Sequence, residues 1–157
     1  MSEISDLLER FRRGAEILSV ATTGAGNPEL DFSPAPDKWT PRQIACHLAD
    51  AEYVGAMRFR QVVAEDNPTL TGFDEQKWTA NLNYSTRRIS AILEAFRRVR
   101  LDNYELLKDL PESVYDRYGT HSGRGKLTLK DILREYAEHA ENHAKQIMSA
   151  RQAYKNK

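Results

Sequence analysis

The chain has 157 residues with 23 basic and 23 acidic side chains, so its net charge is zero when histidine is neutral. This length predicts one domain covering residues 1–157. The charge balance argues against nucleic acid or an anionic membrane as a partner, because both favour a basic surface. No apolar run could cross a bilayer, the N-terminus lacks a signal-peptide pattern, and the single cysteine allows no internal disulfide. We therefore expect a cytoplasmic protein.

The first half of the chain predicts two helices. Apolar residues recur every three to four positions over residues 4–18, which indicates an amphipathic helix. Glycines and prolines in residues 22–38 predict a loop. A second helix is predicted from residue 41 to about residue 65, because Thr40 suits the N-cap and Gln43 completes a capping box.

The second half predicts two more helices. Residues 74–82 favour a short helical turn, and apolar periodicity predicts a helix over residues 85–107. Thr128 followed by Asp131 forms another capping box, and the helix that it starts should end near residue 150. No segment alternates as a strand does, so we expect an all-α fold, a four-helix bundle.

Three histidines are predicted to face the core of this bundle. At about 100° per residue, His139 and His143 lie within about 20° of Ile132 on the last helix. His47 falls inside the apolar arc of the second helix. Two imidazoles at positions i and i+4 have Cβ atoms about 5–6 Å apart and can share one ion. Three neutral nitrogens leave positions open for water or substrate, as in catalytic metal sites.

Each histidine taken alone could instead be a hydrogen-bonded core residue. Three on converging faces favour a shared ion, because each buried imidazole otherwise loses its hydration without compensation. Other metal patterns fit poorly. The segment HAENH lacks the HExxH arrangement of zinc proteases, and no Glu-x-x-His pair of a di-iron bundle is present. Imidazole binds several divalent metals, so ligand type does not select one.

Three stretches of the sequence resemble the DinB-like superfamily, in the branch of YfiT-type metal-dependent hydrolases. They are WTPRQIACHLADAE, LTGFDEQKW and GTHSGRGKLTLKDILREYAEHAENHAKQI. The resemblance implies an up-and-down-type bundle of four helices, commonly dimeric. It also implies a divalent metal held by His47, His139 and His143, zinc or nickel in the first place, with iron or manganese as alternatives. Some members of the superfamily use low-molecular-weight thiols, so a thiol cofactor is a further expectation.

Five other polar residues are candidates for the site, each with a structural alternative. Asp50 could orient a ligand histidine or be a surface acid, and Glu135 could accept a proton or be an exposed helix charge. His121, in the loop GTHSGRGK, could act as a fourth ligand, shuttle a proton or cap backbone groups. Arg58 could anchor an anionic substrate tail, pair with Asp74 or extend to solvent at the bundle end. Asp74 could also line the mouth of the pocket.

These observations predict a metal-dependent enzyme that activates water or a thiol for reaction with a small molecule. It would be a hydrolase or a thiol S-transferase. The absence of an assured general base in the sequence favours the thiol slightly. The alternative is a non-catalytic metal-binding or stress-associated module, which would need a closed coordination shell. We expect a homodimer with a small-molecule substrate.

Overall fold

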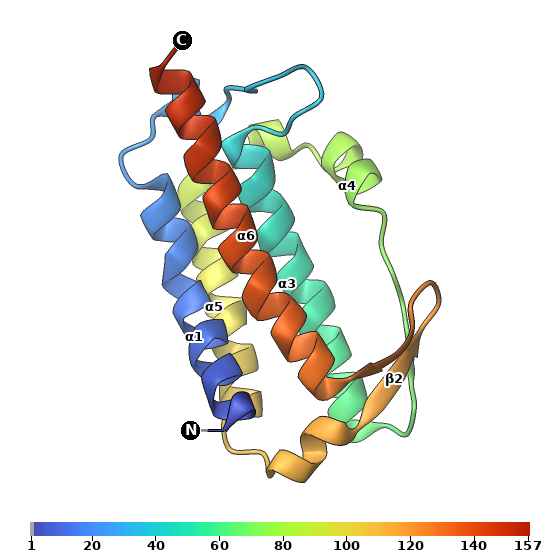
Figure 1. Cartoon of the computed structure of the whole chain (residues 1–157). Helices are drawn as coiled ribbons and strands as arrows, with labels where there is room; N and C mark the ends of the chain where they lie inside the picture. Colours follow the sequence, from blue (N-terminus) through green and yellow to red (C-terminus); the bar gives the residue numbers. More distant parts are fainter. Residues whose placement is uncertain (1) are drawn as a thin grey trace.

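The computed structural model describes residues 2–157, and four long helices of this part of the chain form a bundle (Figure 1). They are α1 (Glu3–Thr22), α3 (Pro41–Ala64), α5 (Ile89–Leu107) and α6 (Leu129–Lys155). Helices α1 and α3 each pack against both α5 and α6, so they occupy opposite corners. The four-helix bundle predicted from the sequence is confirmed.

Neighbouring helices form two parallel pairs, α1 with α6 and α3 with α5. The contacts that show this are Arg10–Glu141 and Ala21–Arg151 for the first pair, and Asp50–Arg87 and Arg60–Asp102 for the second. The connection between α3 and α5, residues 65–88, runs back along the outside of the bundle (Figure 1). The order of directions is therefore up, down, down, up, and differs from the up-and-down arrangement that the resemblance implies.

The helix starts follow the capping chemistry of the sequence. Thr40 and Gln43 form a complete capping box at α3, and Thr128 and Asp131 form another at α6. These caps satisfy backbone N–H groups that have no partner inside the helix. The end of α3 lies one residue before the predicted position, whereas α1 and α6 continue beyond their predicted ends.

Short helical elements lie between the long helices. Helix α2 (Asn27–Leu30) occurs inside the expected loop, and α4 (Glu75–Asn81) lies where a helical turn was expected. Two 3-10 turns, Tyr84–Thr86 and Glu112–Asp116, flank α5. In residues 2–157, no helix is both long and apolar enough to span a bilayer.

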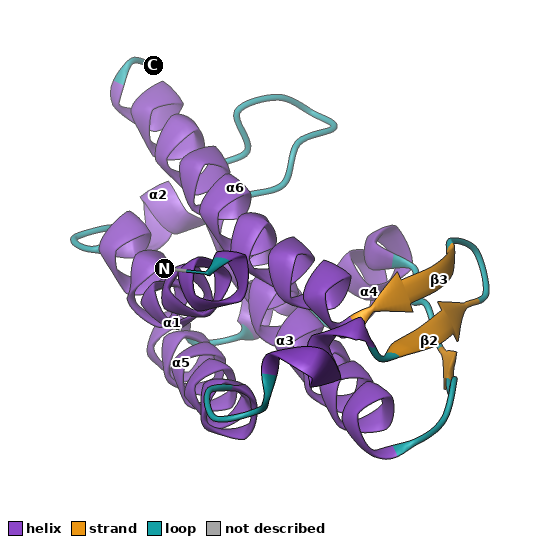
Figure 2. Ribbon diagram, turned by 60° about the horizontal axis from the view of Figure 1, so that its bottom comes forward, coloured by secondary structure: helices purple, strands orange, loops and turns teal. Residues whose placement is uncertain are grey.

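A three-stranded sheet projects from one end of the bundle (Figure 2). Strands β2 (Tyr118–His121) and β3 (Gly125–Thr128) form an antiparallel hairpin, and β1 (Thr69–Leu70) pairs with β2 in parallel. The prediction that the chain has no strand is therefore wrong. Strands of two and four residues are too short to show the alternating pattern by which strands are recognised.

A buried arginine on α5 connects the four long helices. Nε of Arg100 donates a hydrogen bond to the Glu52 carboxylate of α3 at 3.0 Å. Its Nη1 and Nη2 donate to the backbone carbonyls of Phe11 in α1 at 3.1 Å and Tyr136 in α6 at 3.0 Å. Gly14 of α1 leaves room for this guanidinium, because a Cβ there would overlap Nη1. Arg100 thus fixes the helices relative to one another.

We expect Arg100→Met to lower the free energy of unfolding by about 3–5 kcal/mol, because it leaves the Glu52 carboxylate buried and unpaired. Urea denaturation followed by circular dichroism measures this. The control is Arg97→Met on the same helix, which removes the exposed ion pair with Glu16 and should cost about 1 kcal/mol or less. Equal losses for the two variants would contradict a central role for Arg100.

Candidate metal centre

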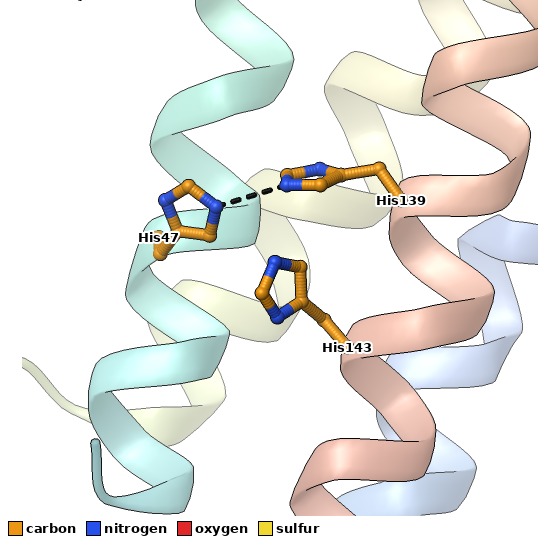
Figure 3. Close-up of side chains that lie close together, drawn as sticks. All are labelled: His47, His139 and His143. Carbon is orange, nitrogen blue, oxygen red and sulfur yellow. Dashed lines mark hydrogen bonds between the residues drawn. The ribbon is translucent and has the colours of Figure 1, made fainter. Parts of the chain in front are cut away.

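Three histidines meet between α3 and α6. His47 of α3 faces His139 and His143 of α6 (Figure 3). The Nε2 atoms of His47 and His139 are 2.9 Å apart, and one nitrogen from each of the three rings lies within 4.8 Å of the other two. The structure thus brings together the three side chains that the sequence predicts as metal ligands.

The spacing of the His47 and His139 nitrogens fits a shared cation, and a nitrogen of His143 lies within 4.8 Å of both rings' nitrogens. Two imidazole nitrogens at about 2.0–2.1 Å from one ion lie about 2.9 Å apart when they subtend a right angle, and about 3.3 Å apart in a tetrahedral arrangement. The His47–His139 separation of 2.9 Å matches the right-angled case.

Burial keeps the three imidazoles neutral. It lowers the pKa of His47 to about 4, with a smaller contribution from the positive charge that His143 can carry. Burial, followed by repulsion from His143, His47 and Arg100, lowers the pKa of His139 to about 3. Burial also lowers the pKa of His143. Because metal ions bind neutral imidazole, these ligands need lose no proton near pH 7.

Two residues that the sequence does not single out orient the cluster. Oε1 of Gln146 lies 2.7 Å from Nδ1 of His143. An amide oxygen accepts hydrogen bonds, so Nδ1 carries the proton and Nε2 presents its lone pair to the site. Trp39 stacks on His143, with ring centroids 6.5 Å apart, and its ring centroid lies 5.2 Å from that of His47. The i, i+3 spacing of His143 and Gln146 is the signal that could have identified the amide.

A pocket of about 310 Å³ opens beside the cluster. Residues on its wall include His139, Arg58, Phe73, Glu75, Arg124 and Glu135. They come from α3, α6, the outer connection and the β2–β3 hairpin. Since His139 is part of the wall, a small molecule in the pocket contacts one of the three histidines.

Glu75 is an acidic residue at the cluster that the sequence analysis missed. Its Oε1 lies 3.9 Å from Nε2 of His47, and its side chain is half exposed to solvent. It occupies the first turn of α4, which packs against α3. Its neighbour Asp74 was the candidate from this stretch. Which of the two acids faces the histidines depends on how α4 packs against α3, and helical periodicity does not reveal this.

The structure gives Asp50 and Asp74 other partners than those expected. Asp50 accepts hydrogen bonds from the Tyr84 hydroxyl at 2.7 Å and from Arg87 Nη1 at 3.0 Å, so it joins α3 to the start of α5. Asp74 caps α4 by accepting from the Lys77 N–H at 3.0 Å. Both carboxylates therefore have structural partners, and among the residues described Arg58 is not a partner of Asp74.

His121 and Glu135 lie apart from the three converging nitrogens. Nδ1 of His121 accepts a hydrogen bond from the Gly123 N–H at 3.0 Å, the backbone-capping alternative of the sequence analysis. The metal-ligating group found in residues 2–157 does not include it. Glu135 lines the pocket, but its carboxylate accepts a hydrogen bond from Arg124 Nη1 at 2.9 Å. This ion pair occupies the carboxylate of Glu135 and directs it toward Arg124.

The fold and the site together define a class of protein, a four-helix bundle with three facing histidines suited to one metal ion. The sequence profile of the DinB superfamily matches residues 10–147. This chain belongs to the DinB superfamily, as the resemblance in its sequence indicates.

Relatives and solved structures agree with this assignment. A protein of Oceanobacillus iheyensis, named "putative metal-dependent hydrolase", is 27% identical over 149 residues, which cover 95% of this chain and 82% of the relative. YfiT from Bacillus subtilis superposes with a TM-score of 0.90 at 22% identity, covering 97% of this chain and 89% of YfiT. A mycothiol-dependent maleylpyruvate isomerase superposes with a TM-score of 0.73 at 14% identity, covering 93% of this chain and 61% of the isomerase. The two superpositions show a shared fold.

We expect the purified protein to retain about one divalent ion per chain after dialysis, and His143→Ala to lose it. Elemental analysis by mass spectrometry measures the content. His121→Ala is the matched control, because it removes the histidine that lies outside the cluster. If the wild-type protein and His143→Ala carry the same small fraction of metal, the site is wrong.

The pKa values also predict how acid affects the metal-free protein. An unfolded histidine titrates near 6.5, whereas folded His47 and His139 titrate near 4 and 3. Between these values the unfolded state binds more protons, so the free energy of unfolding falls as the pH drops from about 7 to about 4. Each of the two histidines should contribute a loss of about 1 kcal/mol at pH about 5.5.

Urea unfolding of chelator-treated protein at neutral and acidic pH tests this expectation. His139→Asn removes one titrating group from the cluster, so its stability should depend less on pH than that of the wild type. Groups outside the cluster titrate in both proteins, so the difference reports on the histidine cluster. An identical pH dependence in both would show that His139 titrates normally in the folded state.

Proposed function

We propose that this protein is a divalent-metal-dependent hydrolase acting on a small molecule. The observation that carries the proposal is the convergence of three neutral imidazoles beside an open pocket. A divalent ion, expected to be zinc or nickel, would supply the Lewis acidity that activates water or a thiol near neutral pH. The name that the Oceanobacillus iheyensis relative carries supports the same reaction class.

The residues around the histidines have complementary roles in this proposal. His47, His139 and His143 would hold the ion, and Gln146 would keep His143 in the ligating tautomer. Glu75 accepts the proton of the attacking water at Oε1 and returns it to the leaving group. Trp39 and Phe73, whose rings lie near His47, exclude bulk water from one side of the site.

Glu75 favours hydrolysis over thiol transfer. A thiol forms its reactive anion more readily than water does, so a site without a base favours the thiol. The carboxylate beside His47 supplies such a base. The pocket on the His139 side likewise favours an enzyme over a non-catalytic module, because a module would close the coordination shell with a fourth protein ligand.

The experiment measures turnover of a panel of activated esters and amides by the metal-loaded protein. We expect Glu75→Gln to lower kcat by about 10²-fold or more while its metal content is unchanged. The matched control is Glu138→Gln, another acid on the pocket wall, which should leave turnover nearly unchanged.

A second assay offers an electrophilic acceptor together with a panel of low-molecular-weight thiols. Hydrolysis that needs no thiol, and an acceptor that no thiol modifies faster with the protein present, agree with the proposal. Turnover that requires a thiol and is insensitive to Glu75→Gln would overturn hydrolysis and identify thiol S-transfer.

A further inference from the structure

Arg58 of α3 is a buried cation without an acidic partner. Its side chain is almost entirely buried, at 7% exposure. Nη2 donates to the backbone carbonyl of Thr71 at 2.9 Å, and Nε is buried without any hydrogen-bond partner in the part of the chain that the structure describes. Within residues 2–157, no carboxylate oxygen lies within 4.0 Å of the guanidinium. Because Asp74 caps α4 and does not pair with Arg58, the charge of Arg58 is uncompensated.

The other buried arginines show how unusual this is. Arg100 donates to Glu52 and to two backbone carbonyls. Arg42, at 5% exposure, donates to the Asp31 carboxylate at 2.7 Å and to the Arg87 carbonyl at 2.8 Å. Each of these guanidinium groups has a counter-charge, because burying a charge alone costs free energy. A buried arginine that lacks one is suited to an anion supplied from outside the chain.

Arg58 and His139 line the same pocket. Arg58 follows His47 by eleven positions, about 16 Å along the axis of α3, and long side chains of a helix lean toward its N-terminus. The backbone of Arg58 is therefore remote from the ion, and the lean of its side chain brings it into the cavity that His139 also lines. A ligand in that cavity can place one end at the histidines and the other at Arg58.

The charges along the pocket wall differ between its two ends. Glu75 lies at the histidine end, 3.9 Å from His47. Glu135 is neutralised by Arg124 through a hydrogen-bonded ion pair. Arg58 retains an unpaired positive charge. An anionic group that enters the pocket is therefore attracted to the Arg58 end.

We propose that Arg58 binds a carboxylate of the substrate, so that the enzyme acts on small carboxylic acids whose reacting group lies several bonds from the carboxylate. The planar guanidinium offers two parallel N–H donors, which match the two oxygens of a carboxylate. The inference rests on the proposed function, because it assigns the reacting end of the substrate to the three histidines.

The test uses ω-mercaptocarboxylates of increasing chain length, compared with ω-mercaptoalcohols of the same lengths, as probes of cobalt-loaded protein. Thiolate binding to cobalt gives a charge-transfer absorption band, so each dissociation constant is measured without any turnover. At the chain length that spans the distance to Arg58, we expect the mercaptocarboxylate to bind at least about tenfold more tightly than the mercaptoalcohol of the same length. Arg58→Met should abolish this preference and leave the affinity for the alcohol unchanged.

Two further variants keep the result interpretable. Arg58→Lys retains the charge but not the paired donors, and should keep a reduced preference for the carboxylate. Arg60→Met alters an exposed arginine of the same helix, which pairs with Asp102, and should behave as the wild type does. Circular dichroism verifies that each variant is folded.

The outcomes separate the two proposals. If the mercaptocarboxylates and the mercaptoalcohols bind the cobalt-loaded protein equally tightly, the role of Arg58 is overturned and the metal centre is unaffected. A preference that survives Arg58→Met would also overturn it. Failure of the protein to bind cobalt would overturn the proposed function instead. In that case, hexanoate should still raise the melting temperature of the metal-free protein more than hexanol does. If hexanoate has the same advantage over hexanol with Arg58→Met, the anion site is refuted.

Discussion

The arrangement of the whole molecule depends on the buried contacts of Arg100. This one side chain reaches α1, α3 and α6 from α5, through Phe11, Glu52 and Tyr136. Buried ion pairs contribute little net stability compared with apolar packing, but an unpaired member is costly, so they penalise any other alignment of the helices. Four helices with apolar stripes could pack in several registers. Arg100 selects the register in which its three partners surround it.

That register also determines the geometry of the metal centre. Glu52 lies on α3 close to His47, and Tyr136 lies on α6 one turn before His139. Because Arg100 holds Glu52 and Tyr136 in place, it also fixes the distance between His47 on α3 and the histidines on α6. The site needs no loop to assemble it, because its three candidate ligands are on rigid helices. Its variable part is the outer connection, which supplies Phe73, Glu75 and the pocket wall.

The sequence predicted the parts of this protein that depend on local chemistry. Capping boxes and helical periodicity place the long helices, and the same periodicity turns three histidines inward. Packing between distant segments determines the up-down-down-up order, the short sheet and the location of Glu75 beside His47. The periodicity of a single helix does not encode such packing. Asp50 shows the same limit. Its place on the second helix follows from the sequence, but its partner, Arg87, comes from the segment just before another helix.

Arg58 and Arg100 illustrate how burial can distinguish a structural charge from one that is suited to a ligand. Both are arginines of the helical bundle, and both are removed from water. The donors of Arg100 are used by the protein itself, so any ligand would have to displace Glu52 from a fully buried pair. Arg58 has one backbone partner and lines a cavity, so an entering carboxylate gains the interaction that the fold leaves unmade. The free energy that folding spends on burying Arg58 is thereby recovered on binding, which gives an anionic substrate an advantage that a neutral one of equal size lacks.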